Sequence, residues 1–342
     1  MTFVPRARRL CVINKTGKNR DSQTYRNFLA LTAVGVLAAC TGGSPITSAD
    51  AVGIGTGTQP LTLEAEQVEE TTEAAGSPNI YGSEINSELT LNDLDYDPAT
   101  DELVLNNLPF DGDNIYARNA AVSASVGSAF GVYENVGGNS NYYAVFRRAG
   151  SGYSQVGTVG TDRYLSFGFG GVAAQRLDGS GALPAANTQY LFTGEYAAVR
   201  TIIDPTTGSQ VQYVAGTAQI DVDIADFDTT GAVEGVIVNR RFFDNNGVQL
   251  TALDTADFIS LATGEINFDN WTIASSTATA VSLTTGQSGA SGTWQALFAG
   301  PNGEEVAGIV VVSGSGPVGI DPATGDFIEV QVRETGGFIA TR

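Results

Sequence analysis

Short runs in which apolar and polar residues alternate dominate the chain from residue 79 onward, and each run ends at glycine, asparagine or aspartate. A strand with one buried face requires this period of two, because successive side chains point to opposite faces. No window of about 12 or more residues shows a convincing helical period. The pattern predicts an all-β, antiparallel fold. The expected strands are 103–105, 142–146, 164–169, 210–214, 218–224, 233–238, 293–298, 307–312 and 327–332.

One turn pattern recurs between the runs, as Asp97–Asp101, Asp204–Gly208 and Asp321–Gly325. Its first aspartate can accept a hydrogen bond from the backbone two residues on, its proline presets φ, and its last residue tolerates the left-handed region. We expect hairpin tips here, with variants at Asp228–Gly231 and Asp244–Gly247. Calcium binding is the alternative, but none of the five has the EF-hand spacing with a glutamate at the twelfth position.

A group of aspartates at 221, 223, 226 and 228 could instead belong to a carboxylate site. In a strand, Asp221 and Asp223 share one face while Val222 and Ile224 take the other. A solvent-facing strand therefore explains these residues. A hydrolase that uses only carboxylates stays open as an alternative, although no pair of acids is singled out.

The first 40 residues have the order of a bacterial lipoprotein leader. A basic stretch precedes an apolar segment of 12 residues, Phe28 to Ala39, and Leu37-Ala38-Ala39 leads into Cys40. The apolar segment is shorter than the roughly 20 residues that cross a bilayer, so it predicts a signal peptide over 1–39. The alternatives are an ordinary secretory signal with Cys40 incidental, or a buried helix. The resemblance to a lipobox implies cleavage before Cys40 and a diacylglyceryl group on its sulfur. Thr41, with no aspartate there, resembles lipoproteins sent to the outer membrane.

Composition restricts the chemistry of the processed chain. The whole chain has 17 basic and 37 acidic residues, and the predicted signal peptide 1–39 contains seven of the basic residues and one of the acidic ones. The processed chain would therefore have 10 basic and 36 acidic residues, a formal charge of −26. Binding to nucleic acid depends on lysine and arginine at phosphates and is excluded. Beyond residue 39 there is no histidine or lysine, and Cys40 is the sole thiol. Catalysis by a serine or cysteine nucleophile with a histidine base, Schiff-base chemistry on lysine, and zinc binding by histidine or cysteine are thereby excluded.

Residues 40–78 are rich in glycine, serine, threonine, alanine and glutamate and contain no aromatic residue. Such a segment cannot bury enough apolar surface to offset the entropy of ordering, so we expect a disordered, lipidated, acidic tether.

A second specific signal lies between Gly292 and Ile309. It predicts a strand with Trp294, Ala296 and Phe298 on one side, a reversal at 300–303, and a returning strand. The segment resembles the barrel signature of the transferrin-binding protein B family, and 215–223 followed by 231–237 resembles the two strands ahead of it. The resemblance implies an eight-stranded antiparallel barrel over 187–342, preceded by a smaller β-rich handle-like domain over 79–186.

Aromatic residues also gather before the barrel, at Tyr142, Tyr143, Phe146, Tyr153, Tyr164, Phe167 and Phe169, beside Arg147, Arg148 and Arg163. Tyrosine and arginine are favoured in protein interfaces. Alternating aromatic residues in a β domain form core more often, and this is the interpretation we favour.

These features together predict a lipid-anchored, non-enzymatic binding protein of a bacterial outer membrane. It would attach to the membrane through the lipid on Cys40, capture a protein or small iron-bearing ligand, and present it to an outer-membrane receptor. No cofactor, metal or catalytic residue is expected. A structural or adhesion-type surface lipoprotein is the first alternative, and the carboxylate-only hydrolase is the second.

Overall fold

The computed structural model describes residues 79–82, 91–163, 170–177, 179, 181–182, 189–204, 208–224, 231–254 and 256–342, all within one compact unit. The predicted signal peptide 1–39, the predicted tether 40–78 and Cys40 lie outside the described residues. The strand expected at 164–169 also lies outside them.

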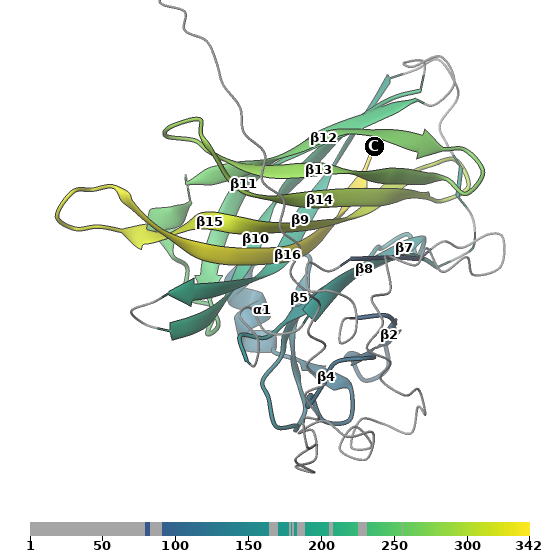
Figure 1. Ribbon diagram of the computed structural model, residues 1–342. Coiled ribbons are helices and arrows are strands. Elements are labelled where there is room, and N and C mark those ends of the chain that lie inside the picture. Colours follow the sequence, from purple (N-terminus) through teal and green to yellow (C-terminus); the bar gives the residue numbers. More distant parts are fainter. Residues whose placement is uncertain are drawn as a thin grey trace, which may run out of the picture. The chain divides into compact units, whose positions relative to one another are not determined.

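The described residues form two antiparallel sheets (Figure 1). The first, here called the handle sheet, has the spatial order β1-β8-β7-β6-β5-β4-β3-β2. Its strands are β1 (Asn79–Gly82), β2 (Leu94–Asp97), β3 (Glu102–Leu105), β4 (Ile115–Arg118), β5 (Gly131–Asn135), β6 (Tyr143–Arg148), β7 (Ser154–Gly160) and β8 (Gly170–Arg176).

The second sheet is a closed barrel in which each strand pairs with its neighbours in the sequence and β9 also pairs with β16. Its strands are β9 (Gln189–Asp204), β10 (Gly208–Asp223), β11 (Ala232–Asp244), β12 (Asp257–Asn267), β13 (Thr272–Ser282), β14 (Ser288–Ala299), β15 (Glu305–Ile320) and β16 (Phe327–Thr341). The predicted all-β class and eight-stranded antiparallel barrel are confirmed. The two sheets fall within the ranges expected for handle and barrel.

Alternating side chains fill the barrel interior. Trp294, Ala296 and Phe298 of β14 point inward, as their spacing predicts, and Val306 and Val310 of β15 meet them across the ladder. The reversal between these strands has Gly300 at φ 89° and Gly303 at φ 65°, where a side chain would be strained. The interior is therefore a packed core.

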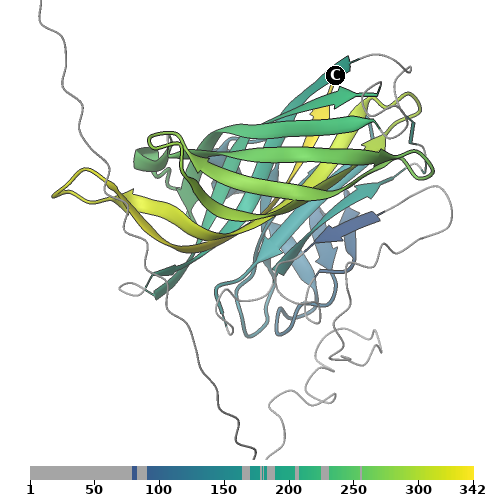
Figure 2. The same ribbon diagram turned by 45° about the horizontal axis from the view of Figure 1, so that its top comes forward.

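The outer wall of part of the barrel is buried as well, because the handle sheet packs against it. Ala307, Ile309 and Val311 of β15 face the handle sheet, while their neighbours face the interior. Figure 2 shows the handle strands close to this side of the barrel. Burial on both faces explains why β15 is a nearly continuous apolar run.

Polar contacts join the two sheets at fixed points. Arg176 of β8 donates to the carbonyls of Phe298, at 2.9 Å, and of Asn270 and Trp271, each at 3.2 Å. Thr158 of β7 donates to the carbonyl of Thr335, at 2.8 Å. These hydrogen bonds join buried side chains of the handle sheet to backbone carbonyls of the barrel, so they favour one register between the sheets.

Two expectations about the elements are wrong in detail. The runs 210–214 and 218–224 belong to the single strand β10, since the glycine and small residues between them continue the ladder to β9.

A short helix, α1 (Ala120–Val126), was not expected. Asn119 caps it by accepting from the backbone N–H of Val122, and Gly127 ends it at φ 59°. One apolar face only two turns long gives no periodic signal.

The aspartate turns are confirmed where they are described. The side chain of Asp97 accepts from the backbone N–H of Ala99, and that of Asp321 from Ala323, each at 2.8 Å. Asp244 accepts in the same way from Asn246, at 2.9 Å. The tips at 205–207 and 225–230 lie outside the described residues. The β15–β16 hairpin that carries Asp321 extends beyond its neighbours in both views (Figures 1 and 2).

A buried carboxyl group lies in the loop between β3 and β4. Asp111 is fully buried, accepts from the hydroxyl of Tyr116 at 2.9 Å, and its Oδ1 atom has no partner. Burial raises the pKa of Asp111 to about 6, against the opposing hydrogen bond from Tyr116. The nearby charge of Asp113 raises the pKa further.

This carboxyl predicts a pH-dependent stability. Because the folded-state pKa is raised, the contribution of Asp111 is complete below pH 3.8 and is lost as pH rises through about 6. Asp111→Asn is therefore expected to stabilise the fold at pH 8 relative to the parent, by up to about 3 kcal/mol, with a smaller gain or none at pH 4. Thermal unfolding across that range measures it. The exposed Asp113→Asn should change the profile far less, and equal profiles for the two variants would contradict the prediction.

Candidate functional site

A β-bulge in the barrel wall forms part of the most promising site. The β10–β11 register shifts between Ala215 and Thr217, so that Asn239 and Arg240 both stand opposite Gly216. Asn239 takes a φ of 54°, which asparagine tolerates better than most residues. The extra residue reverses the alternation of β11. Ile237 points into the barrel before the bulge, and Phe242 does so after it.

The C-terminal end of α1 lies over the same wall. Glu195 of β9 accepts from the hydroxyl of Ser128 and from the backbone N–H of Ala129, both at 2.6 Å. These bonds tie the helix end to the barrel and occupy the Oε2 atom of Glu195. The turn after α1 and the barrel wall therefore form the site together.

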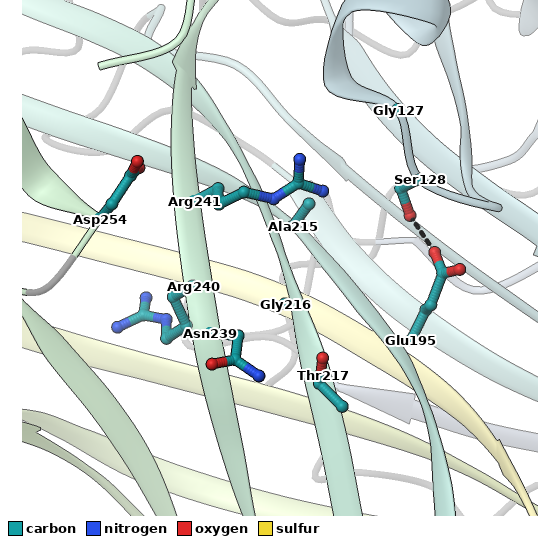
Figure 3. A pocket seen from close by; sticks show the side chains of 10 residues that line it. All are labelled: Gly127, Ser128, Glu195, Ala215, Gly216, Thr217, Asn239, Arg240, Arg241 and Asp254. Carbon is teal, nitrogen blue, oxygen red and sulfur yellow. Dashed lines mark hydrogen bonds between the residues drawn. The ribbon is translucent and has the colours of Figure 1, made fainter. Parts of the chain in front are cut away.

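Between these parts lies a cavity of about 400 Å³, here called the junction pocket (Figure 3). Its volume is within the range of small-molecule sites, roughly 300–1,000 Å³. Its lining is polar and comes from the turn after α1, from β9, β10 and β11, and from the turn before β12: Gly127, Ser128, Glu195, Ala215, Gly216, Thr217, Asn239, Arg240, Arg241 and Asp254.

The two arginines of the pocket differ in their environment. The guanidinium of Arg241 lies over the ring of Phe243, 5.6 Å from its centroid, and makes no ion pair within the described residues. Arg240 is buried and pairs with Asp257 and Glu334 inside the barrel. Its Nε atom has no hydrogen-bond partner.

The pair partners of Arg240 form a charged cluster in the barrel interior. Glu334 also accepts from the hydroxyl of Tyr196 at 2.7 Å and lies 3.8 Å from Nε of Arg200. Burial disfavours the charge of Arg240, but Asp257 and Glu334 outweigh it and hold the pKa of Arg240 above its ordinary value. Burial lowers the pKa of Arg200 to about 10, against the attraction of Glu334. The positive charges of Arg200 and Arg240 are thus balanced by the carboxylates of Asp257 and Glu334, and both carboxylates are held in ion pairs.

The predicted site residues do not gather in this pocket. Cys40 lies outside the described residues. Asp221 is exposed and Val222 is fully buried, as expected for a strand with one solvent face. Asp226 and Asp228 lie outside the described residues. Within the part of the chain that is described, no group of three or more acidic, histidine or cysteine side chains could hold a metal ion.

The aromatic cluster of the handle divides as the core interpretation expects. Tyr142 and Phe146 are buried in the core of the handle sheet on the side away from the barrel. Tyr143 and Tyr153 pack against the core between handle and barrel. The remaining members, Tyr164, Phe167 and Phe169, lie outside the described residues.

Sequence reasoning missed the residues of the junction pocket. The signal that could have found them is the triplet Asn239-Arg240-Arg241, which interrupts an apolar strand in a chain poor in cations.

No helix in the described part of the chain is long and apolar enough to cross a bilayer.

The fold and site define a class of protein: a small closed barrel with a handle sheet docked on its wall and a polar pocket at their junction. No family model and no curated protein matches the chain. Among solved structures, it is similar to a double mutant of the vaccine antigen transferrin-binding protein B from Haemophilus parasuis Hp5, with 14% identity, a TM-score of 0.35, and coverage of 72% of this chain and 44% of that one.

A single mutant of the same antigen gives 14% identity and a TM-score of 0.32, covering 63% of this chain and 37% of that one. The chain therefore spans less than half of the length of these structures.

Proposed function

We propose that this protein is a lipid-anchored, non-enzymatic binding protein of a bacterial outer membrane, which captures a protein or small iron-bearing ligand for uptake. The anchor is the lipid on Cys40, and 40–78 is the tether. The handle and barrel carry the binding surface.

The junction pocket is the observation that carries the binding role. It has the volume of a ligand site, and three of the side chains that line it make no hydrogen bond within the described residues: Thr217, Asn239 and Arg241. Catalysis lacks comparable support, since Asp257 and Glu334 are both paired with Arg240 and the pocket has neither histidine nor lysine. A rigid barrel with its core filled by side chains suits a scaffold that presents a preformed site.

The anchor is tested by labelling cells with radioactive palmitate. The parent chain should carry label and fractionate with the outer membrane, and Cys40→Ser should carry none. Cys11→Ser is the matched control, because this residue lies inside the predicted signal peptide, and its label should be unchanged. An unlabelled parent chain recovered in the soluble fraction would refute the anchor.

The binding role is tested by cross-linking in intact cells grown with and without iron. We expect one outer-membrane or extracellular protein to be recovered, and to bind the purified chain directly. Protease treatment of intact cells establishes which face of the membrane the protein occupies. Absence of any direct partner under both conditions would favour a structural lipoprotein instead.

A further inference from the structure

Charges of both signs line the junction pocket without meeting one another. The charge of Arg240 is neutralised inside the barrel, so this residue presents no free charge to the pocket. The other charged side chains of the lining are Arg241, Glu195 and Asp254. Within the described residues, Arg241 forms an ion pair with neither carboxylate. The pocket therefore holds one guanidinium and two carboxylates that the chain leaves unpaired.

Separate contacts keep these three side chains apart. The guanidinium of Arg241 lies over an aromatic ring of its own strand, and Glu195 is held through Oε2 by the turn after α1. Asp254 accepts through Oδ2 from the side chain of Gln249, at 2.8 Å. In Figure 3 the Arg241 side chain lies between Asp254 on one side and Glu195 on the other. Because the charges are already in place, a ligand that fits between them need not pay for ordering them.

Two of these groups have hydrogen-bonding capacity left for a ligand. Arg241 donates no hydrogen bond within the described residues, and Oε1 of Glu195 accepts none. A guanidinium matches a carboxylate, and a carboxylate oxygen matches an ammonium group. The Oδ1 atom of Asp254 is buried, so we assign this residue only a contribution of negative charge. A ligand that satisfies both free groups must carry a carboxylate and an ammonium.

The net charge of the lining indicates which such ligand fits best. Two carboxylates against one guanidinium leave one negative charge, which a ligand with one positive charge in excess would balance. A basic amino acid has this composition, with one carboxylate and two cationic groups at neutral pH. The chain as a whole carries a formal charge of −20 and attracts such a ligand. A cavity of about 400 Å³ is within the range of small-molecule sites.

We propose that the junction pocket binds a free basic amino acid, with its carboxylate at the guanidinium of Arg241 and an ammonium group at Oε1 of Glu195. The inference rests on the proposed binding role and names the chemical class of ligand that this one pocket accepts. Thr217 and Asn239, which line the same pocket and make no hydrogen bond within the described residues, are available to either end of the ligand.

The test is calorimetric titration of the full chain, purified in detergent, with L-lysine. Arg241→Gln should weaken lysine binding about 10- to 100-fold, as expected for one charge-assisted contact. Arg147→Gln is the matched control, because Arg147 lies over Phe130 at 6.0 Å as Arg241 lies over Phe243, yet lines no part of this pocket. Its affinity for lysine should equal that of the parent.

Two analogues test the two ends of the ligand in the parent chain. Cadaverine, which is lysine without its carboxylate, should bind about 10-fold more weakly than lysine or worse, and Arg241→Gln should remove most of this difference. Glutarate, which has two carboxylates and no ammonium, should also bind about 10-fold more weakly or worse.

Absence of lysine binding, equal loss in Arg241→Gln and Arg147→Gln, or an affinity for cadaverine or glutarate equal to that for lysine would overturn the proposal. A partner found by cross-linking together with no lysine binding would leave the binding role standing and refute this inference alone.

Discussion

Glu334→Gln is expected to lower the free energy of unfolding by about 3–5 kcal/mol, because it leaves a buried cation uncompensated. Glu334 is 1% exposed and accepts from Arg240 and Tyr196, with Arg200 close by. The glutamine has nearly the same size, so the change removes the charge without opening a cavity. Asp257 would then be the one carboxylate paired with an arginine in the cluster.

Chemical denaturation with urea measures this loss. Glu329→Gln is the control, because Glu329 is an exposed residue of the same strand and bonds only to the hydroxyl of Ser315. That control should stay within about 0.5 kcal/mol of the parent. A loss below about 1 kcal/mol for Glu334→Gln would mean that water reaches the cluster, as it does for surface ion pairs.

Gly194→Ala is expected to cost about 3 kcal/mol or more, because it places a methyl group on the seam that closes the barrel. Gly194 of β9 pairs with Ala340 of β16, and a Cβ atom there would overlap the carbonyl oxygen of Ile339. Overpacking costs typically about 1–3 kcal/mol when side chains can shift, and here the obstacle is backbone.

Two measurements separate this effect from a general loss of stability. Hydrogen exchange should speed up first at the amides of β9 and β16, where the seam opens. Gly319→Ala is the control, since a Cβ at this glycine of β15 would meet no atom within 4 Å. If Gly194→Ala is as stable as the parent, or if Gly319→Ala loses as much stability, then close packing at Gly194 does not limit the seam.

Much of the architecture could be predicted because it depends on neighbours in the sequence. An aspartate turn such as Asp321–Gly325 is built from its own side chain and backbone, so its residues suffice to predict it. Trp294, Ala296 and Phe298 share a face for the same reason, since a strand alternates whatever lies beside it.

The site residues could not be predicted in this way. Alternation from Ile237 would send Asn239 and Arg241 into the barrel, whereas the bulge opposite Gly216 turns Arg240 inward and leaves Arg241 in the pocket. The partners of Arg240 are also distant in the sequence. Asp257 belongs to the next strand, 17 residues after Arg240, and Glu334 lies 94 residues after Arg240.

The sequence by itself determined the all-β class, the turn chemistry and the closed barrel, because these follow from local alternation and from one segment that resembles a known signature. Tertiary structure alone decided which of two adjacent arginines is neutralised in the interior and which lines the pocket on the outer face of the wall. The physical reason is that a single extra residue in a strand reverses every following side chain, and only pairing with the neighbouring strand shows where that residue is inserted.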